Sequence, residues 1–285
     1  MPTRASRASV RRQLRKAGLS SQRAARLPLL THRHRVARRA FAREKMGSDW
    51  KKVCSASSCL STSWCPLCRS SSQVVFSDEK RFCLYSDRPV RVWRYKHQRF
   101  EAGFTKQTTK VRTSIMVWAA INGVLPLPHQ IVVVCPIIPG RGEILLLRCD
   151  ERQDSVSYQE RILKEALAFI KPNPRTTLGR RGTIFQQDGA PCHTSHSTKA
   201  WLRRHNVVFM DPWPGQSPDL NPVEHVWCEI TRTLGGEGFK SRDVLWDALQ
   251  EATKKIDKAK IIHLYDSMDR RCQAVIKAKG GSTRY

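Results

Sequence analysis

The stretch Val74–Phe82 has the sequence VVFSDEKRF, an apolar run followed by charged residues. A short apolar run bounded by polar residues predicts a buried strand. Two further runs of this kind follow along the chain, SIMVWAA at 114–120 and TIFQQ at 183–187. Together the three runs predict a sheet, and the remaining segments are placed around it.

Strands come first along the chain and helices join them later. We expect strands at Val74–Phe76, Phe82–Leu84, Val90–Trp93, Ser114–Ala120, Thr183–Gln187 and Val207–Met210. Helical patterns predict helices at Ser157–Ile170, His196–His205, Asn221–Leu234, Asp243–Ile256 and Lys260–Lys277. Strands first, then strands alternating with helices, are typical of an α/β fold with a mixed sheet.

The charge of the chain indicates a polyanionic partner. The 285 residues include 51 Lys and Arg against 24 Asp and Glu, a net charge of +27. Residues 1–52 carry +14 of this charge, and the remaining 233 residues carry +13. Such a distribution is expected of a basic DNA-binding arm joined to a more balanced domain. The charge alone does not distinguish a protein that binds nucleic acid from an enzyme that cuts it.

Several protein classes are disfavoured by the composition. The first thirty residues are rich in Arg and contain no apolar run of signal-peptide length. The apolar region Ile115–Ile138 is interrupted by Asn122, Gly123 and two prolines, which favours core strands and a loop over a membrane span. Ten Cys in a basic protein of this kind are expected to be free thiols or metal ligands.

Two basic helices are expected before the sheet. Ser9–Ala17 has Val10 and Leu14 on one side and basic residues on the other, which fits either a recognition helix or a solvated helix. A second helix is expected from an N-cap at Thr31 to Met46, with little to bury beyond Val36, Ala40 and Phe41. We interpret it as a linker helix that lies on DNA or on a partner. The candidate DNA-binding residues are Arg11, Arg12, Arg15, Lys16, Arg33, Arg35, Arg38 and Arg39.

Three acidic residues stand at the ends of predicted elements. Asp78 follows the first strand, Asp188 ends the strand TIFQQD, and Glu224 lies at the start of a helix in SPDLNPVEHVW. Carboxylates at strand ends can meet at one edge of a sheet, where three of them can hold two divalent cations for phosphodiester chemistry. Oxygen ligands favour Mg²⁺ or Mn²⁺.

Each of these acids also has a purely structural interpretation. Asp78 could simply terminate a strand, and Asp188 before Gly189 could belong to a turn. Glu224 could close a capping box with Asn221, with Pro222 at the first helical position. Position along the chain leaves both interpretations open.

A series of motifs favours the catalytic interpretation. VVFSDEKRF, SIMVWAAI, FQQDGAPCHTS, DPWPGQSPDLNPVEHVW and SMDRRCQAVIKAKGGSTRY occur in this order. In content and order they resemble the Tc/mariner superfamily of DDE transposases, on the Tc-type side, over almost all of 74–285. The resemblance implies a ribonuclease-H-like catalytic domain flanked by helices, two Mg²⁺ or Mn²⁺ ions, and cut-and-paste DNA transposition with integration at TA sites.

The resemblance also assigns individual residues. Asp78, Asp188 and Glu224 match the three acids of the family, which makes them the implied catalytic and metal-binding residues. His193 matches a family histidine expected near the active site without being a metal ligand. The implied partner is double-stranded DNA with transposon inverted repeats, in the nucleus, with no membrane and no small-molecule substrate; a homodimer stays open as the assembly.

The chain departs from the family pattern in three places. Only ASVRRQLRKAGLSSQRAAR resembles a helix-turn-helix, the end of the second of two units, so we expect an N-terminally truncated protein with weak specific and salt-sensitive non-specific DNA binding. The Ser- and Cys-rich stretch 53–73 has poor zinc-site spacing at Cys54, Cys59, Cys65 and Cys68, and 124–139 is unusually apolar. We interpret both stretches as inserts of retained-intron or gene-model origin, the first of them disordered.

These features predict a domain plan. Residues 1–30 are the remnant of a DNA-binding unit, 31–52 a basic linker helix, 53–73 an insert, and 74–285 the catalytic domain with the second insert at 124–139. The alternative function is that of a transposon-derived DNA-binding protein, or the product of a decayed element, without catalytic activity.

Overall fold

The computed structural model describes residues 7–17, 28–48, 50, 73–84, 113–123, 144–149, 153–171, 183–235 and 238–285. The expected strand Val90–Trp93 and the stretch 124–139 lie outside the described residues, as does the stretch 53–73 except for Gln73.

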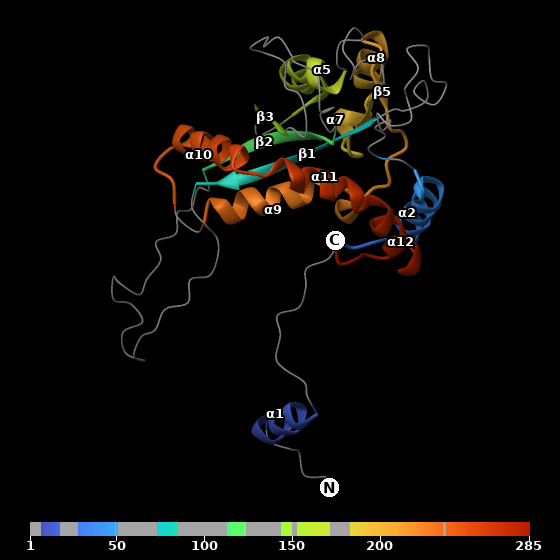
Figure 1. Ribbon diagram of the computed structural model, residues 1–285, viewed down its shortest axis with the longest axis vertical. Helices are drawn as coiled ribbons and strands as arrows, with labels where there is room; N and C mark the ends of the chain where they lie inside the picture. The colour runs from blue at the N-terminus through green and yellow to red at the C-terminus, as the bar shows by residue number, and fades with distance from the viewer. Residues whose placement is uncertain are drawn as a thin grey trace, which may run out of the picture.

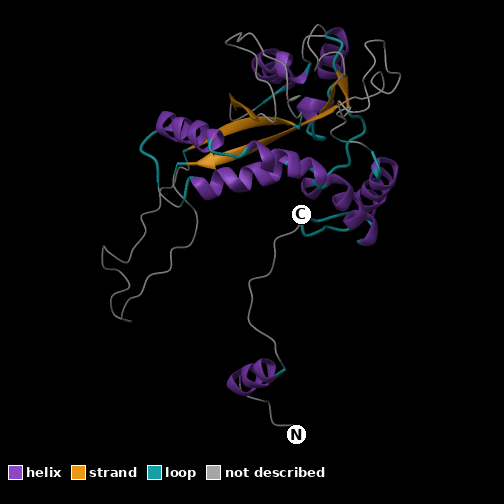
Figure 2. Ribbon diagram, in the orientation of Figure 1, coloured by secondary structure: helices purple, strands orange, loops and turns teal. Residues whose placement is uncertain are grey.

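A five-stranded mixed sheet forms the centre of the domain (Figures 1 and 2). The strands are β1 (Gln73–Cys83), β2 (Ser114–Asn122), β3 (Ile144–Cys149), β4 (Thr183–Gln186) and β5 (Val208–Phe209), in the order β3-β2-β1-β4-β5. β1, β2 and β3 are antiparallel neighbours, whereas β4 and β5 run parallel to β1. The predicted α/β fold with a mixed sheet is confirmed.

β1 is one continuous strand of 11 residues, where the sequence predicted two short strands at Val74–Phe76 and Phe82–Leu84. β2 pairs with it as far as Cys83, but β4 pairs only with the segment from Gln73 to Phe76. The charged second half of β1 therefore has an open edge where β4 stops, and polar residues can stand there without breaking the strand. Phe76 pairs with Gln186, so Asp78 and Asp188 each lie two residues beyond the same pair on adjacent parallel strands.

Helices pack against both faces of the sheet. One layer contains α9 (Val223–Thr233), α10 (Arg242–Lys254), α11 (Lys258–Asp266) and α12 (Met268–Lys277). The other layer contains a continuous helix made of α4 (Ser155–Ser157), the π-helical turn η4 (Tyr158–Leu163) and α5 (Lys164–Ile170), together with α7 (Pro191–Thr194) and α8 (His196–Arg204). The short 3₁₀ helix η5 (Pro218–Leu220) precedes α9.

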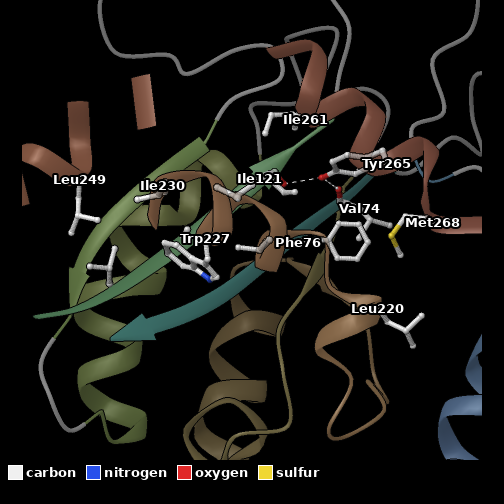
Figure 3. Packing of buried hydrophobic residues seen from close by; sticks show 14 of the residues in the cluster. Val74, Phe76, Ile121, Leu220, Trp227, Ile230, Leu249, Ile261, Tyr265 and Met268 are labelled. Carbon is white, nitrogen blue, oxygen red and sulfur yellow. Dashed lines mark hydrogen bonds between the residues drawn. The ribbon is translucent and has the colours of Figure 1, made fainter. Parts of the chain in front are cut away.

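The alternation of side chains along β1 divides the core into two clusters. Val74 and Phe76 join the cluster under α9 to α12, whereas Val75 joins the cluster under η4, α5 and α8. Figure 3 shows Phe76 next to Tyr265 in the first of these clusters, where the two rings lie 5.5 Å apart. The Tyr265 hydroxyl shares its one hydrogen between the backbone oxygens of Val74 at 2.8 Å and Ile121 at 2.9 Å, so α11 is tied to β1 and β2.

The helix expected over Lys260–Lys277 is two helices, α11 and α12, separated at Ser267. The Ser267 hydroxyl donates to the backbone oxygen of Leu264 at 2.6 Å and accepts from Arg271 Nε at 2.8 Å. A serine that bonds a carbonyl of its own preceding turn competes with the helical hydrogen bonds. The break at this residue follows from that competition.

α2 (His32–Lys45) begins at the expected N-cap Thr31, but its buried face differs from the expected one. Phe41 is buried as expected, whereas Val36 is 54% exposed and Ala40 is exposed, and Arg38 and Ala42 are buried in their place. α2 packs beside α12 (Figure 1). The helix therefore buries a different stripe from the expected one, because that stripe includes an arginine, which a hydrophobic pattern does not count. α1 (Arg7–Lys16) is a separate basic helix.

Candidate active site

Asp78, Asp188 and Glu224 line one cavity of about 450 Å³. They come from three different places in the fold: β1, the turn that follows β4 and the first turn of α9. The cavity is also lined by the segment 215–218 before η5 and by His34 of α2. The structure thus brings together the three acids that the sequence singled out, at the edge where β1 extends past β4.

Asp78 is held by a buried tryptophan of α9. Trp227 Nε1 donates to Asp78 Oδ2 at 2.9 Å, and the Trp227 ring packs edge-on against Phe82 at 5.7 Å. Burial raises the pKa of Asp78 to about 8, and the carboxylates of Glu224 and Glu79 add to this shift. Each carboxylate therefore disfavours the charge of the other, which a bound cation would relieve.

Asp188 is oriented by the turn that follows β4. Its Oδ1 accepts from the backbone N–H of Ala190 at 2.9 Å and lies 2.6 Å from His193 Nδ1. Burial acts to raise the pKa of Asp188, but the hydrogen bond and charge of His193 outweigh it and hold this pKa below its usual value. The side chain of Asp188 is 46% exposed, so one side of the carboxylate stays open to the cavity.

Glu224 is fixed by the start of α9. The Asn221 side chain accepts from the backbone N–H of Val223 at 3.1 Å and donates to the backbone oxygen of Ser77 at 2.9 Å. This one amide ties the first turn of α9 to the residue next to Asp78. Burial raises the pKa of Glu224, and the nearby Lys80 partly opposes that shift.

His193 joins Asp188 to a fourth acid, Glu79. His193 Nε2 lies 3.1 Å from Glu79 Oε1, an ion-pair distance, and both atoms are buried with no other partner among the described residues. Burial acts to lower the pKa of His193, whereas Tyr158, Asp188 and Glu79 raise it overall. The His193 ring also packs against Tyr158 at 4.3 Å.

Sequence reasoning missed Glu79, Trp227 and Tyr158 as parts of this site. Glu79 follows Asp78 directly and looked like one more charge after the strand. Trp227 is a buried core residue whose N–H also reaches Asp78. Because these contacts arise between distant segments, no local spacing indicates them.

The donor set fits a hard divalent cation. Three carboxylates face one cavity, and burial raises the pKa of two of them, Asp78 and Glu224. Asp78, Asp188 and Glu224 can therefore supply the oxygen ligands that Mg²⁺ and Mn²⁺ prefer. Glu79, Asp188 and His193 also lie close enough together to share an ion.

The expected DNA-binding residues occupy different environments. Arg12, Arg15 and Lys16 are exposed on α1, which also carries Arg11, and Arg33 and Arg35 are exposed on α2. Arg39 is partly buried, and Arg38 is only 1% exposed. No helix in the described ranges is both long and apolar enough to cross a membrane.

Comparison with known proteins points to one family. A family model described as "DDE superfamily endonuclease" matches residues 129–245. The Tcb2 transposase of Caenorhabditis briggsae is 34% identical over 282 residues, which cover 97% of this chain and 87% of that protein. The Tc1 transposase of Caenorhabditis elegans is 33% identical over 285 residues, with 98% and 88% covered.

Solved structures with the same fold include the Mos1 mariner transposase. The Mos1 paired-end complex with Mn superposes with a TM-score of 0.70 at 18% identity, covering 98% of this chain and 72% of that chain. The Mos1 catalytic domain superposes with a TM-score of 0.60 at 16% identity, covering 91% and 100%. The ribonuclease-H-like fold expected from the motifs is confirmed by this likeness. The identity to the Tcb2 and Tc1 transposases, over nearly the whole chain, shows the family. The chain belongs to the Tc/mariner superfamily of DDE transposases.

Proposed function

We propose that this chain cuts and joins transposon DNA at a site formed by Asp78, Asp188 and Glu224, which hold two Mg²⁺ or Mn²⁺ ions. The observation that carries the proposal is the meeting of three carboxylates, from β1, the turn after β4 and α9, at one cavity. When bound, such ions activate a water or hydroxyl nucleophile and stabilise the leaving oxygen of a phosphodiester. The Mos1 structures with Mn and with Mg support the choice of ion.

The chain's own residues hold the three carboxylates in place. Trp227 restricts Asp78, and the backbone N–H of Ala190 together with His193 restricts Asp188. Glu224 stands on a helix whose inner face is buried. Sites supported by rigid elements and by further hydrogen bonds keep reacting groups aligned better than loops do. In this proposal His193 positions Asp188 and is not an ion ligand.

The substrate in this proposal is double-stranded DNA with transposon inverted repeats, inserted at TA dinucleotides in the nucleus. The net charge of +27 supports a DNA partner, because Lys and Arg that neutralise phosphates release counterions. The printed descriptions of the Mos1 structures name a paired-end complex and a strand transfer complex. They support a homodimer that holds two DNA ends together.

Cleavage of labelled transposon-end DNA tests the proposal. With Mg²⁺ or Mn²⁺ the unchanged chain should cut the duplex, and Asp188→Asn should lower the rate more than about 100-fold, because a lost ligand exceeds the 10- to 100-fold typical of an outer partner. Asp247→Asn removes an exposed acid of α10 and is the matched control, which should cut normally. Binding without cleavage by the unchanged chain would replace the proposal with the non-catalytic alternative.

A further inference from the structure

Arg38 of α2 has its guanidinium in the interior of the domain. Its Nε donates to the backbone oxygen of Gly280 at 3.0 Å, and one terminal nitrogen, Nη1, donates to the backbone oxygen of Gln216 at 3.0 Å and to Asp219 Oδ1 at 2.7 Å. The other terminal nitrogen, Nη2, donates to Asp219 Oδ2 at 2.6 Å and to the backbone oxygen of Gly281 at 3.1 Å. A guanidinium has five N–H donors, and all five are used. Arg38 therefore has no donor left for a DNA phosphate in this arrangement.

Asp219 connects Arg38 to Thr283, in the segment that follows α12. Asp219 is 5% exposed, and its Oδ2 also accepts from the backbone N–H and hydroxyl of Thr283, at 3.1 and 2.9 Å. Its backbone oxygen accepts from Arg271 of α12 at 2.7 Å. Asp219 is thus held by Arg38 and Thr283 at its side chain and by Arg271 at its backbone, which leaves it little freedom to move.

The segment held by Arg38, residues 216–219, leads directly into the candidate active site. The residues before Asp219 in the chain that line the cavity are Gln216, which has a left-handed φ of 55°, and Pro218. Asn221 and Glu224, which follow Asp219 in the chain, line it too. Only four residues separate Asp219 from Glu224. Any shift of Asp219 is therefore passed through η5 to the start of α9.

α2 itself forms part of the cavity wall. His34 lies one helical turn before Arg38 and lines the same cavity as the three acids. Gly280 fits so closely under α2 that a side chain there would collide with the backbone oxygen of Arg35. The distance between α2 and the residues around Gly280 is thus fixed by two contacts, that of Arg35 and that of Arg38.

We propose that Arg38 is a positioning residue that, by holding Asp219 and the backbone oxygen of Gln216, sets the place of Glu224 relative to Asp78 and Asp188. The inference rests on the proposed function of these three acids. It assigns to α2, expected to be a linker that contacts DNA, the role of a structural wall of the catalytic cavity. A residue needed only for folding would change the stability of the protein. Arg38 is proposed to change the distances between the three carboxylates that would bind the cations.

Arg38→Lys tests this proposal with little loss of charge. Lysine keeps the positive charge beside Asp219 but has three donors in place of the planar set of five. We expect the Mn²⁺ concentration for half-maximal cleavage to rise about 10-fold, within the range for lost outer partners, while cleavage recovers at high Mn²⁺. The increase in Tm on adding Mn²⁺, measured without DNA, should shrink in parallel. Arg43→Met removes an exposed arginine of the same helix and should change neither value.

The two proteins are compared at a temperature where circular dichroism shows both fully folded, because an unfolded fraction would itself raise the apparent half-saturating Mn²⁺ concentration. Under that condition a merely structural role would leave this concentration unchanged. If Arg38→Lys fails to fold, the double variant Arg38→Met with Asp219→Leu replaces the buried ion pair by apolar groups and takes its place. Unchanged Mn²⁺ dependence in a folded variant overturns the proposal, and failure of both variants to fold assigns Arg38 to folding alone. No cleavage by the unchanged chain, with a normal Mn²⁺ effect on Tm, would refute the proposed catalysis and leave the positioning testable by Tm.

Discussion

Trp227 is the residue whose double role is clearest. Its ring fills the core between β1 and α9, and its N–H holds the proposed cation ligand Asp78 at 2.9 Å. One side chain thus connects the stability of the domain to the orientation of the site. Arg38 makes the same connection through Asp219, but with charge instead of apolar area.

Trp227→Phe should separate these two roles. Phenylalanine keeps a ring beside Phe82 but removes the donor to Asp78. We expect DNA cleavage to fall about 10- to 100-fold, the usual cost of removing a partner that orients a metal ligand. The measurement is the cleavage rate at fixed Mg²⁺, with circular dichroism to verify the fold.

Trp246→Phe is the matched change on α10, and it should leave the cleavage rate of the enzyme as it is. A folded Trp227→Phe protein that cuts DNA at the normal rate would show that the hydrogen bond to Asp78 has no part in catalysis.

At the residue scale the sequence predicted the three acids for a physical reason. Each acid follows an apolar run or begins a helical pattern, which is visible in the sequence, but only the order of the motifs favoured a catalytic role. In the structure Asp78 lies inside β1, and Asp188 lies two residues past β4. The partner residues were not predictable in the same way. Glu79 meets His193 across 114 positions of sequence, and Arg38 meets Asp219 across 181. These contacts depend on the packing of whole elements.

At the element scale, Gly123 shows how closely α11 lies against the end of β2. A Cβ on Gly123 would stand 2.7 Å from Tyr265 Cδ2. The Tyr265 ring cannot easily withdraw, because its hydroxyl is bound to the backbone of both β1 and β2 (Figure 3). The absence of a Cβ at Gly123 therefore allows the short distance between β2 and α11.

Gly123→Ala should destabilise the protein by about 1–3 kcal/mol, the typical cost of overpacking a closed core. The measurement is the urea midpoint of unfolding with an unchanged slope. Gly215→Ala is the control for stability, since a Cβ at Gly215 has no atom within 4 Å among the described residues. Equal midpoints for Gly123→Ala and the unchanged chain would contradict the close packing described for Tyr265.

The sequence predicted the existence of the helices and strands with strong hydrophobic patterns better than it predicted the residues at which they begin and end. α8, α9 and α10 lie within two residues of the expected bounds. β1 was predicted as two pieces because the central charges suggested a break, whereas the open edge past β4 accommodates them. α11 and α12 were predicted as one helix because the bonds of Ser267 to Leu264 and Arg271 are not visible in a hydrophobic pattern.

At the scale of the whole molecule, the catalytic unit extends further toward the N-terminus than the predicted boundary at residue 74. Phe41, Ala42 and Trp50 belong to the same core cluster as Phe76 and Trp227. We therefore propose that the folding unit begins near residue 28 and includes α2. α1 is not part of that core cluster.

Two shortened chains test this boundary. A chain that starts at residue 28 should unfold at the same temperature as the full chain. A chain that starts at residue 48 lacks Arg38 and leaves Asp219 buried without its cation, which typically costs about 3–5 kcal/mol in addition to the lost contacts of Phe41. Calorimetry measures both transitions. Equal stability of the two shortened chains would return α2 to the role of a linker.

The contact of Arg38 with Gly280 has a consequence for the time course of synthesis. The two residues are 242 positions apart, so at about 5–20 residues per second the ribosome completes the partners of Arg38 roughly 10–50 s after Arg38 itself. Until then Asp219 lacks Thr283, and the cavity wall beside Glu224 is unfinished. A nascent chain therefore carries all three acids before it contains the partners of Arg38 on which their proposed alignment depends.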